Sequence, residues 1–187
     1  MKLIKKTLSE ISNNFNILGE KSVPQIEEAA KIMIKSLKNG GKIMLCGNGG
    51  SASDAQHLSA ELVGRYRKTR RPLASVALTT DTSIITAISN DFSFDYIFSK
   101  QVEAIGKEGD VLYAISTSST SKNVINALKV AKKLKIKTLG VTGKDDSGFK
   151  EICDNIISVP ASRPDRIQEM HIAVGQILCE ILEEELC

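Results

Sequence analysis

The sequence predicts an α/β fold, a doubly wound parallel sheet of five strands within a single domain. Two observations indicate this fold. Short apolar runs of strand type alternate with amphipathic runs of helix type, and two of the apolar runs end in loops rich in glycine or hydroxyl residues, at 47–51 and 116–121. In such sheets ligands bind beyond the carboxyl ends of the strands. We therefore expect both loops to face a ligand.

Composition bounds the class of protein. The chain has 187 residues, of which 42% are hydrophobic, enough for one ordinary domain spanning 1–187. A net charge of +3 is too small to indicate a nucleic-acid or membrane partner, and no segment resembles a signal peptide or a membrane span. The four cysteines form no Cys-x-x-Cys pair, which predicts neither a disulfide framework nor a cysteine zinc site. A reduced, cytoplasmic setting is the expectation.

The first 40 residues predict two helices. In the first, apolar residues alternate spacings of four and three, as in a narrow coiled-coil seam: Ile4, Leu8, Ile11, Phe15 and Leu18. Such a helix either docks on its own domain or packs on copies of itself, and we favour oligomerisation for this extension. The second helix follows Pro24 and runs to Lys38, where Asn39-Gly40-Gly41 stops it.

The remaining elements alternate. The predicted strands are 43–46, 73–78, 110–115, 136–141 and 155–159, and helices are predicted from about 51, from 82 to 88, after Ser121 to about 131, and from Pro164 to Glu184. Nothing in the chain resembles a linker, repeat or low-complexity segment.

The stretch from 43 to 61 carries the strongest functional pattern. An apolar strand breaks into Gly47-Asn48-Gly49-Gly50-Ser51, and a helix follows that Ser51 or Ser53 is suited to cap. Free N–H groups and the helix dipole make such a loop an anion site. Asp54, His57 and Glu61 then share one helix face. The pattern predicts a phosphorylated substrate with acid–base chemistry beside it.

Other interpretations fit parts of this stretch. Gly47-x-Gly49-x-x-Ala52 matches a relaxed dinucleotide fingerprint, but the acidic residue expected about 20 positions later is absent. A Walker loop is excluded because no Gly-Lys-Ser/Thr follows. The glycines could also form only a tight turn, with His57 and Glu61 as a surface pair.

Three later segments are ambiguous from pattern alone. Six hydroxyl residues, Ser116 to Ser121, favour phosphate binding over an ordinary serine-rich turn. On the last helix, Gln168 and Gln176 are eight residues apart and can face one cavity, although a solvated face with a stray His171 is the simpler interpretation. The basic run Arg65–Arg71 is typical of a solvated loop; phosphate steering or a nucleic-acid contact are the alternatives.

Taken together, the motifs resemble the phosphoheptose isomerase (sedoheptulose 7-phosphate isomerase) branch of the sugar isomerase (SIS) family. The matching segments occur in the family's order over nearly the whole chain: Cys46–Ser51, Asp54–His57, Glu61–Tyr66, Asn90–Asp91, Ile115–Ser118 and Arg166–His171. The resemblance implies a flavodoxin-like three-layer α/β/α sandwich. It also implies a homotetramer with shared active sites, and conversion of D-sedoheptulose 7-phosphate to D-glycero-D-manno-heptose 7-phosphate for nucleotide-activated heptose, lipopolysaccharide and other surface glycans.

The resemblance also assigns roles to residues. Glu61 would be the general base, with Asp54 and Asp165 as further acidic groups near the site. The phosphate would be held by Ser116, Thr117, Ser118 and Ser121, and the sugar site would be lined by Asn48, Gly49, Gly50, Ser51, Asn90 and Asp91. One Zn²⁺ per subunit would be bound by His57, Glu61, Gln168 and the residue at position 176. A zinc ion suits aldose–ketose exchange because it can act as a Lewis acid.

Three positions depart from the family pattern. The family's last histidine, a zinc ligand and acid, is Gln176, which offers an amide oxygen but no titratable proton. His171 lies about 140° away on the helix and is a poor substitute. The usual glycine after Ser-Thr-Ser is Ser119, and Lys122 replaces a common proline.

Two functional classes remain, and within the first the sequence does not distinguish a seven-carbon sugar phosphate from another sugar phosphate. The first is the isomerase; the second is a non-catalytic SIS protein that binds a phosphosugar or a protein partner, similar to the replication-initiator adaptor of some bacteria. Glu61 favours the enzyme because an adaptor needs no base there, whereas Gln176 favours the adaptor.

Overall fold

A computed structural model describes residues 1–187 and contains one parallel five-stranded sheet, in the order β2-β1-β3-β4-β5. The strands are β1 (Ile43–Gly47), β2 (Ser75–Ala77), β3 (Val111–Ile115), β4 (Lys137–Thr142) and β5 (Asn155–Ser158). The helices are α1 (Lys2–Lys21), α2 (Val23–Lys38), α3 (Gly50–Val63), α4 (Thr82–Asp91), the 3-10 turn η1 (Phe94–Tyr96), α5 (Ser99–Ile105), α6 (Lys122–Lys133) and α7 (Pro164–Leu186). The predicted single α/β domain is confirmed.

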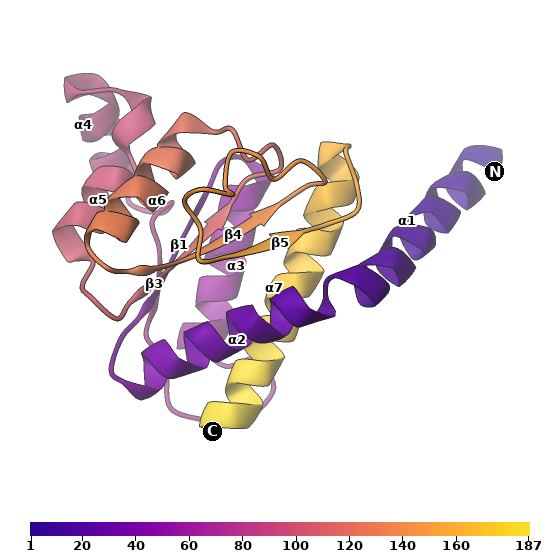
Figure 1. Ribbon diagram of the computed structural model, residues 1–187, viewed down its shortest axis with the longest axis horizontal. Helices are drawn as coiled ribbons and strands as arrows, with labels where there is room; N and C mark the ends of the chain where they lie inside the picture. Colours follow the sequence, from indigo (N-terminus) through magenta and orange to yellow (C-terminus); the bar gives the residue numbers. More distant parts are fainter.

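Helices cover both faces of the sheet, which makes three layers (Figure 1). Successive strand residues point to opposite faces. In β1, Ile43 and Leu45 join a core with α2, α3 and α7, whereas Met44 and Cys46 join a second core with α5 and α6. The predicted three-layer sandwich is therefore confirmed, with an apolar core on each side of the sheet.

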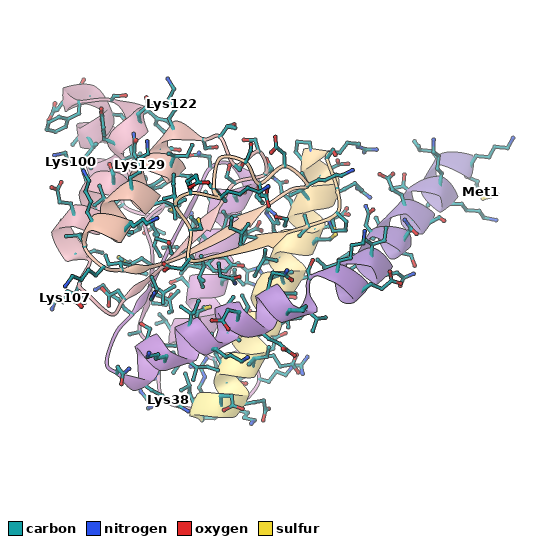
Figure 2. The ribbon with its side chains drawn as sticks, viewed as in Figure 1. Met1, Lys38, Lys100, Lys107, Lys122 and Lys129 are labelled. Carbon is teal, nitrogen blue, oxygen red and sulfur yellow. The ribbon has the colours of Figure 1, made fainter.

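The carboxyl ends and the amino ends of the parallel strands lie at opposite edges of the sheet, and the two edges carry different loops. Figure 2 shows Lys122, at the start of α6, at the upper edge of the molecule, and Lys38 and Lys107 at the lower edge. The loops after β1, β3 and β4 leave the carboxyl, upper edge of the sheet, and α3 and α7 begin there and run downward side by side (Figure 1). This edge therefore collects the loops from which a site can be built.

Several element boundaries differ from the prediction. The strand expected over 73–78 is only β2, because the N–H of Leu73 donates to the carbonyl of Leu62 at the end of α3. The helix expected to begin at Ser51 or Ser53 begins at Gly50, and its N-cap is Gly49 with φ +56° rather than a serine. No helix was predicted between 89 and 109, where η1 and α5 lie. The short α5 buries only two side chains, too few to give a helical period.

Helix α1 projects from the body, and only its second half packs on the domain (Figure 1). Leu18 is buried and Phe15 is half-buried, but Ile4 and Leu8 are 62% and 60% exposed. The apolar seam of this helix is therefore only half covered by its own chain. None of the helices combines the length and apolar character that a membrane crossing requires.

Candidate active site

The glycine loop after β1 is tied to the start of α6 by two asparagines. Asn48 Nδ2 donates to Asn123 Oδ1 at 2.9 Å, and Asn123 Nδ2 donates back to Asn48 Oδ1 at 2.8 Å. Asn123 is buried, and its Oδ1 also accepts the N–H of Val124. The structure thus brings together the two loops that the sequence predicted separately. The two hydrogen bonds with Asn123 also occupy the side-chain amide of Asn48, which was expected to line the sugar site.

Helix α7 approaches the start of α3 very closely. A Cβ at Gly50 would lie 2.6–2.9 Å from the side-chain amide of Gln168, so a larger residue there would displace this amide. Further along, a Cβ at Gly175 would lie 2.4 Å from Leu58 Cδ1. The two helices therefore pack in parallel, with the turn around Gln168 level with Gly50 and the turn around Gly175 level with Leu58.

The acidic and imidazole groups of α3 face α7. His57 Nε2 lies 3.2 Å from Glu61 Oε1, and both side chains are partly exposed. Cys179, one turn beyond Gln176, is close enough to Glu61 for its carboxylate to help raise the thiol pKa to about 12, although burial is the main cause. Gln176 follows Gly175, which lies against Leu58, and precedes Cys179 by one turn on α7.

Asp54 is the unusual titrating group of this cleft. Its Oδ2 is buried without a hydrogen-bond partner. Burial raises the pKa of the Asp54 carboxyl to about 6, although nearby His57 lowers it in part. A carboxyl with this pKa can accept or release a proton near neutral pH. Helix α3 therefore carries, where it packs along α7, a carboxylate base candidate, Glu61, and a second proton-transfer group, Asp54.

The loop after β3 folds on itself. The hydroxyls of Ser116 and Ser121 lie 3.1 Å apart, and those of Ser118 and Thr120 lie 2.9 Å apart. Ser119 adopts φ +55°, and its hydroxyl accepts the N–H of Gly148 from the loop after β4. The serine that stands where the family has glycine is therefore accommodated at a positive φ and gains a contact that glycine could not make.

A cavity of about 330 Å³ lies against this loop. Besides Thr117 and Ser118, it is lined by Lys144 and Ser162, which sequence reasoning did not select. Lys144 follows β4 at the carboxyl edge, and this position is the signal that could have found it. Hydroxyls and an ammonium group suit an anion, although the carboxylate of Asp145 also lines this cavity and opposes one.

Three predicted residues lie apart from this arrangement. Asn90 and Asp91 end α4, a helix with no buried residue, and Asn90 Nδ2 donates to Asp91 Oδ1 at 2.9 Å. Asp165, exposed at the start of α7, is paired with Arg163 at 2.6 Å, and the hydrogen bond from Arg163 lowers its carboxyl pKa. Within one chain, the structure does not bring Asn90 and Asp91 into the α3–α7 cleft (Figure 1).

The predicted metal ligands give a mixed donor set. No group of three or more His, Cys, Asp and Glu side chains is placed to hold a metal ion. His57 and Glu61 do lie together, Gln168 lies against Gly50 at the start of the same helix, and Gln176 is a further amide on α7. One imidazole, one carboxylate and two neutral amides fit a divalent cation, but they bind zinc more weakly than a set with a second imidazole.

The basic run after α3 is the exposed loop that its composition predicts, with the exception of one buried side chain, that of Arg70. Arg70 is only 3% exposed and pairs at 3.0 Å with Glu183 of α7, itself 2% exposed. Arg67 and Lys68 pair with Glu180 and Glu184 at the surface. Much of the positive charge is thus neutralised by α7, which argues against a nucleic-acid surface. Sequence reasoning missed Arg70, Glu183 and Asn123 because their partners are distant in the chain.

Known proteins share this sequence and fold. Residues 8–143 match the SIS domain family. The chain is 55% identical over 161 residues to a phosphoheptose isomerase of Aliarcobacter butzleri, covering 86% of this chain and 85% of the relative. It is 51% identical over 181 residues to that of Nitratiruptor sp., covering 97% of each. The solved phosphoheptose isomerase of Neisseria gonorrhoeae superimposes with a TM-score of 0.93 at 41% identity, and that of Francisella tularensis with 0.95 at 34%. The first match covers 98% of both chains, and the second covers 98% of this chain and 97% of the other.

Proposed function

The chain belongs to the SIS domain family and, within it, to the phosphoheptose isomerases, and we propose that it converts D-sedoheptulose 7-phosphate to D-glycero-D-manno-heptose 7-phosphate. It is an aldose–ketose isomerase. The observation that carries the proposal is the His57–Glu61 pair on the helix that leads out of the glycine loop, whose first residue, Gly50, lies against Gln168. The adaptor alternative is not favoured, because this pair has no use in an adaptor and the similar relatives are named as isomerases.

Each region of the site has a task in this reaction. The Ser116–Ser121 loop, with Lys144 beside it, binds the phosphate. Glu61 removes the proton from one of the carbons C1 and C2 and returns it to the other, through an enediol. Asp54 has an unpartnered Oδ2 and a pKa of about 6, which suit proton exchange. It exchanges protons with the substrate oxygens in place of the family's histidine, which is Gln176 in this chain. Gln176 orients the sugar as a hydrogen-bonding amide.

Zinc is part of the proposal. His57, Glu61, Gln168 and Gln176 would hold one Zn²⁺ per subunit, and when bound it would polarise the substrate carbonyl. The paired positions of His57 and Glu61 support this, and the two amides predict a lower affinity than a second histidine would give.

We further propose a homo-oligomer, a tetramer with shared active sites. Apolar side chains are exposed on α1, and α4 exposes Ile84 next to Phe92 and Phe94. If α4 packed on another chain, it would bring Asn90 and Asp91 to the α3–α7 region of that chain. Within their own chain these residues lie apart from that region. Light scattering should give the mass of four chains, whereas a monomer at micromolar concentration would contradict the proposal.

The setting and the pathway complete the proposal. All four cysteines are free, which supports a reduced, cytoplasmic location. The product would enter nucleotide-activated heptose synthesis for lipopolysaccharide or other surface glycans.

The test is a coupled assay of purified protein with sedoheptulose 7-phosphate, with added zinc and with chelator. Turnover supports the isomerase, and turnover that chelator abolishes and zinc restores supports the metal site. Turnover that is insensitive to chelator would refute zinc alone. A folded protein that binds the sugar phosphate without turnover would refute the catalytic proposal.

A further inference from the structure

The segment after α3 folds back onto the last turns of α7 and wraps one buried carboxylate. Glu183 Oε1 accepts the N–H of Tyr66 at 3.1 Å, and Oε2 accepts those of Arg67 and Lys68, each at 2.8 Å. Burial alone would raise the Glu183 pKa, but these three N–H donors and the guanidinium of Arg70 outweigh it and lower the pKa to about 2. Glu183 is therefore ionised and fully hydrogen-bonded inside the protein.

Arg70 connects this carboxylate to the end of α3. Its Nε donates to Glu183 Oε1 at 3.0 Å, its Nη2 donates to the carbonyl of Glu61 at 2.8 Å, and its Nη1 donates to the carbonyl of Leu62 at 2.9 Å. The last carbonyls of a helix lack intrahelical partners, so a guanidinium here closes the helix end. Arg70 thus binds the main chain of the base residue itself.

The two helices also touch at other levels, through neutral groups that do not hold the main chain of Glu61. Near their starts Gln168 lies on Gly50, and in the middle Leu58 lies on Gly175. At the last turn of α3, Leu62 packs in the same apolar core as Leu178 and Cys179 of α7, and the Arg70–Glu183 pair adds the ionic link that ties the main chain of this turn to α7. That turn carries the Glu61 carboxylate, which must face a substrate carbon whose position is set by the phosphate loop on another part of the sheet.

We propose that Arg70 and Glu183 are positioning residues for the base, Glu61. They fix the last turn of α3 against α7, so that the carboxylate meets the substrate carbon at reacting distance. Displacements of about 1 Å from such a geometry can cost roughly 10²-fold in rate. The inference rests on the proposed isomerase function, and it separates catalysis from binding, because the phosphate loop makes no contact with this pair.

A matched control exists elsewhere in the chain. Asp110, 3% exposed, accepts the N–H groups of Lys42 and Lys107 at 3.0 and 2.8 Å and pairs with Lys42 Nζ at 2.5 Å. It is also a buried carboxylate held by main-chain donors and one cation. Its hydrogen bonds join the segments before β1 and β3, and none reaches α3. Asp110→Asn therefore reproduces the loss of stability without loosening Glu61.

The experiment compares Arg70→Lys, Glu183→Gln and Asp110→Asn with the wild type by melting temperature, kcat and KM for sedoheptulose 7-phosphate. We expect all three melting temperatures to fall. Arg70→Lys and Glu183→Gln should lower kcat at least tenfold with KM unchanged within twofold, and Asp110→Asn should leave kcat within twofold. Glu183→Gln keeps the shape of the side chain and is the variant to use if Arg70→Lys does not fold.

Three results would overturn the inference: an unchanged kcat in the folded Arg70 or Glu183 variant, an equal loss of kcat in Asp110→Asn, or a rise in KM as large as the fall in kcat. A wild-type protein without turnover would instead refute the proposed function, before any variant is compared.

Discussion

The loop at 116–121 and the cleft between α3 and α7 are built in opposite ways. In the loop, the hydroxyls of Ser116, Ser118 and Ser119 already have partners within the chain. In the cleft, Asp54 Oδ2 is buried without a partner, as are both ring nitrogens of His171 further along α7. An unsatisfied buried polar group is costly and persists where function requires it. The hydroxyls of the loop are thus satisfied within the chain, whereas the α3–α7 region contains buried polar atoms that are not.

The largest effect is expected from a substitution on α3 that leaves the loop at 116–121 intact. Glu61→Gln removes the base while keeping the size of the side chain, so turnover should fall roughly 10³-fold. The melting temperature and the affinity for the sugar phosphate, measured by calorimetry, should change little because the phosphate loop is intact. Unchanged turnover would refute Glu61 as the base.

The pH dependence of stability tests whether the buried imidazole of His171, on α7, also lacks a hydrogen-bond partner in solution. Burial lowers the His171 pKa to about 4, and the main chain of Thr142 opposes this in part. The unfolded chain, with a pKa near 6.5, therefore takes up the proton first, and stability is lost as the pH falls from 6.5 towards 4. Relative to His171→Leu, the wild type should lose about 2 kcal/mol of unfolding free energy between pH 7 and pH 5.

Urea unfolding at the two pH values provides this measurement. Asp54, with its raised pKa, acts in the opposite direction over the same range, because its folded form binds a proton more readily than its unfolded form. It is present in both proteins and cancels in the comparison. Equal pH dependence in the wild type and His171→Leu would show that the imidazole finds a partner.

A substitution at Gln176 should complete the proposed set of metal ligands and so increase the difference between the α3–α7 region and the loop at 116–121. Gln176→His supplies a second imidazole beside His57 and Glu61, and zinc affinity should rise roughly tenfold or more, as measured by competition with a chromophoric chelator. Asn48→Ala, outside the metal ligands, serves as the control. No gain in affinity would mean that the cleft is shaped around glutamine.

The smallest effect should come from the loop. Ser118→Ala removes one exposed hydroxyl from a set of several, so KM should rise roughly fivefold, about 1 kcal/mol, with kcat nearly unchanged. Ser36→Ala, whose hydroxyl donates to the carbonyl of Gly109 far from the loop, should leave KM as it is. A fall in kcat for Ser118→Ala without a change in KM would contradict the division between binding and catalysis.

The sequence predicted the sheet, its five strands and both loops, because these depend on local periodicity and on glycine or serine at fixed places. It missed α5, whose short apolar pattern resembles a loop, and it favoured the wrong environment for Arg70. That guanidinium is buried by Glu183, which is 113 residues away in the chain. Composition describes a run of charges but does not show which distant carboxylate neutralises it.

The site residues also divide into those that a local pattern predicts and those that only the packing of separate elements brings together. His57 and Glu61 could be paired from their spacing on one helix, and the structure places them 3.2 Å apart. The contact of Gln168 with Gly50 and the link from Asn48 to Asn123 join separate elements, so they follow from the packing of the helices and not from any local pattern. Asn90 and Asp91 end α4, apart from the α3–α7 region, and no local pattern could have shown this separation.

The reciprocal pair of Asn48 and Asn123 has a consequence for how the protein ages. Asn48 precedes Gly49, and an asparagine followed by glycine is chemically prone to lose its amide to attack by the next main-chain nitrogen. Two hydrogen bonds hold this amide in place, and the N–H of Val124 fixes the orientation of its partner. Deamidation would set a carboxylate oxygen against Asn123 Oδ1, two acceptors facing each other. The link that aligns the two loops therefore also protects the bond whose hydrolysis would separate them.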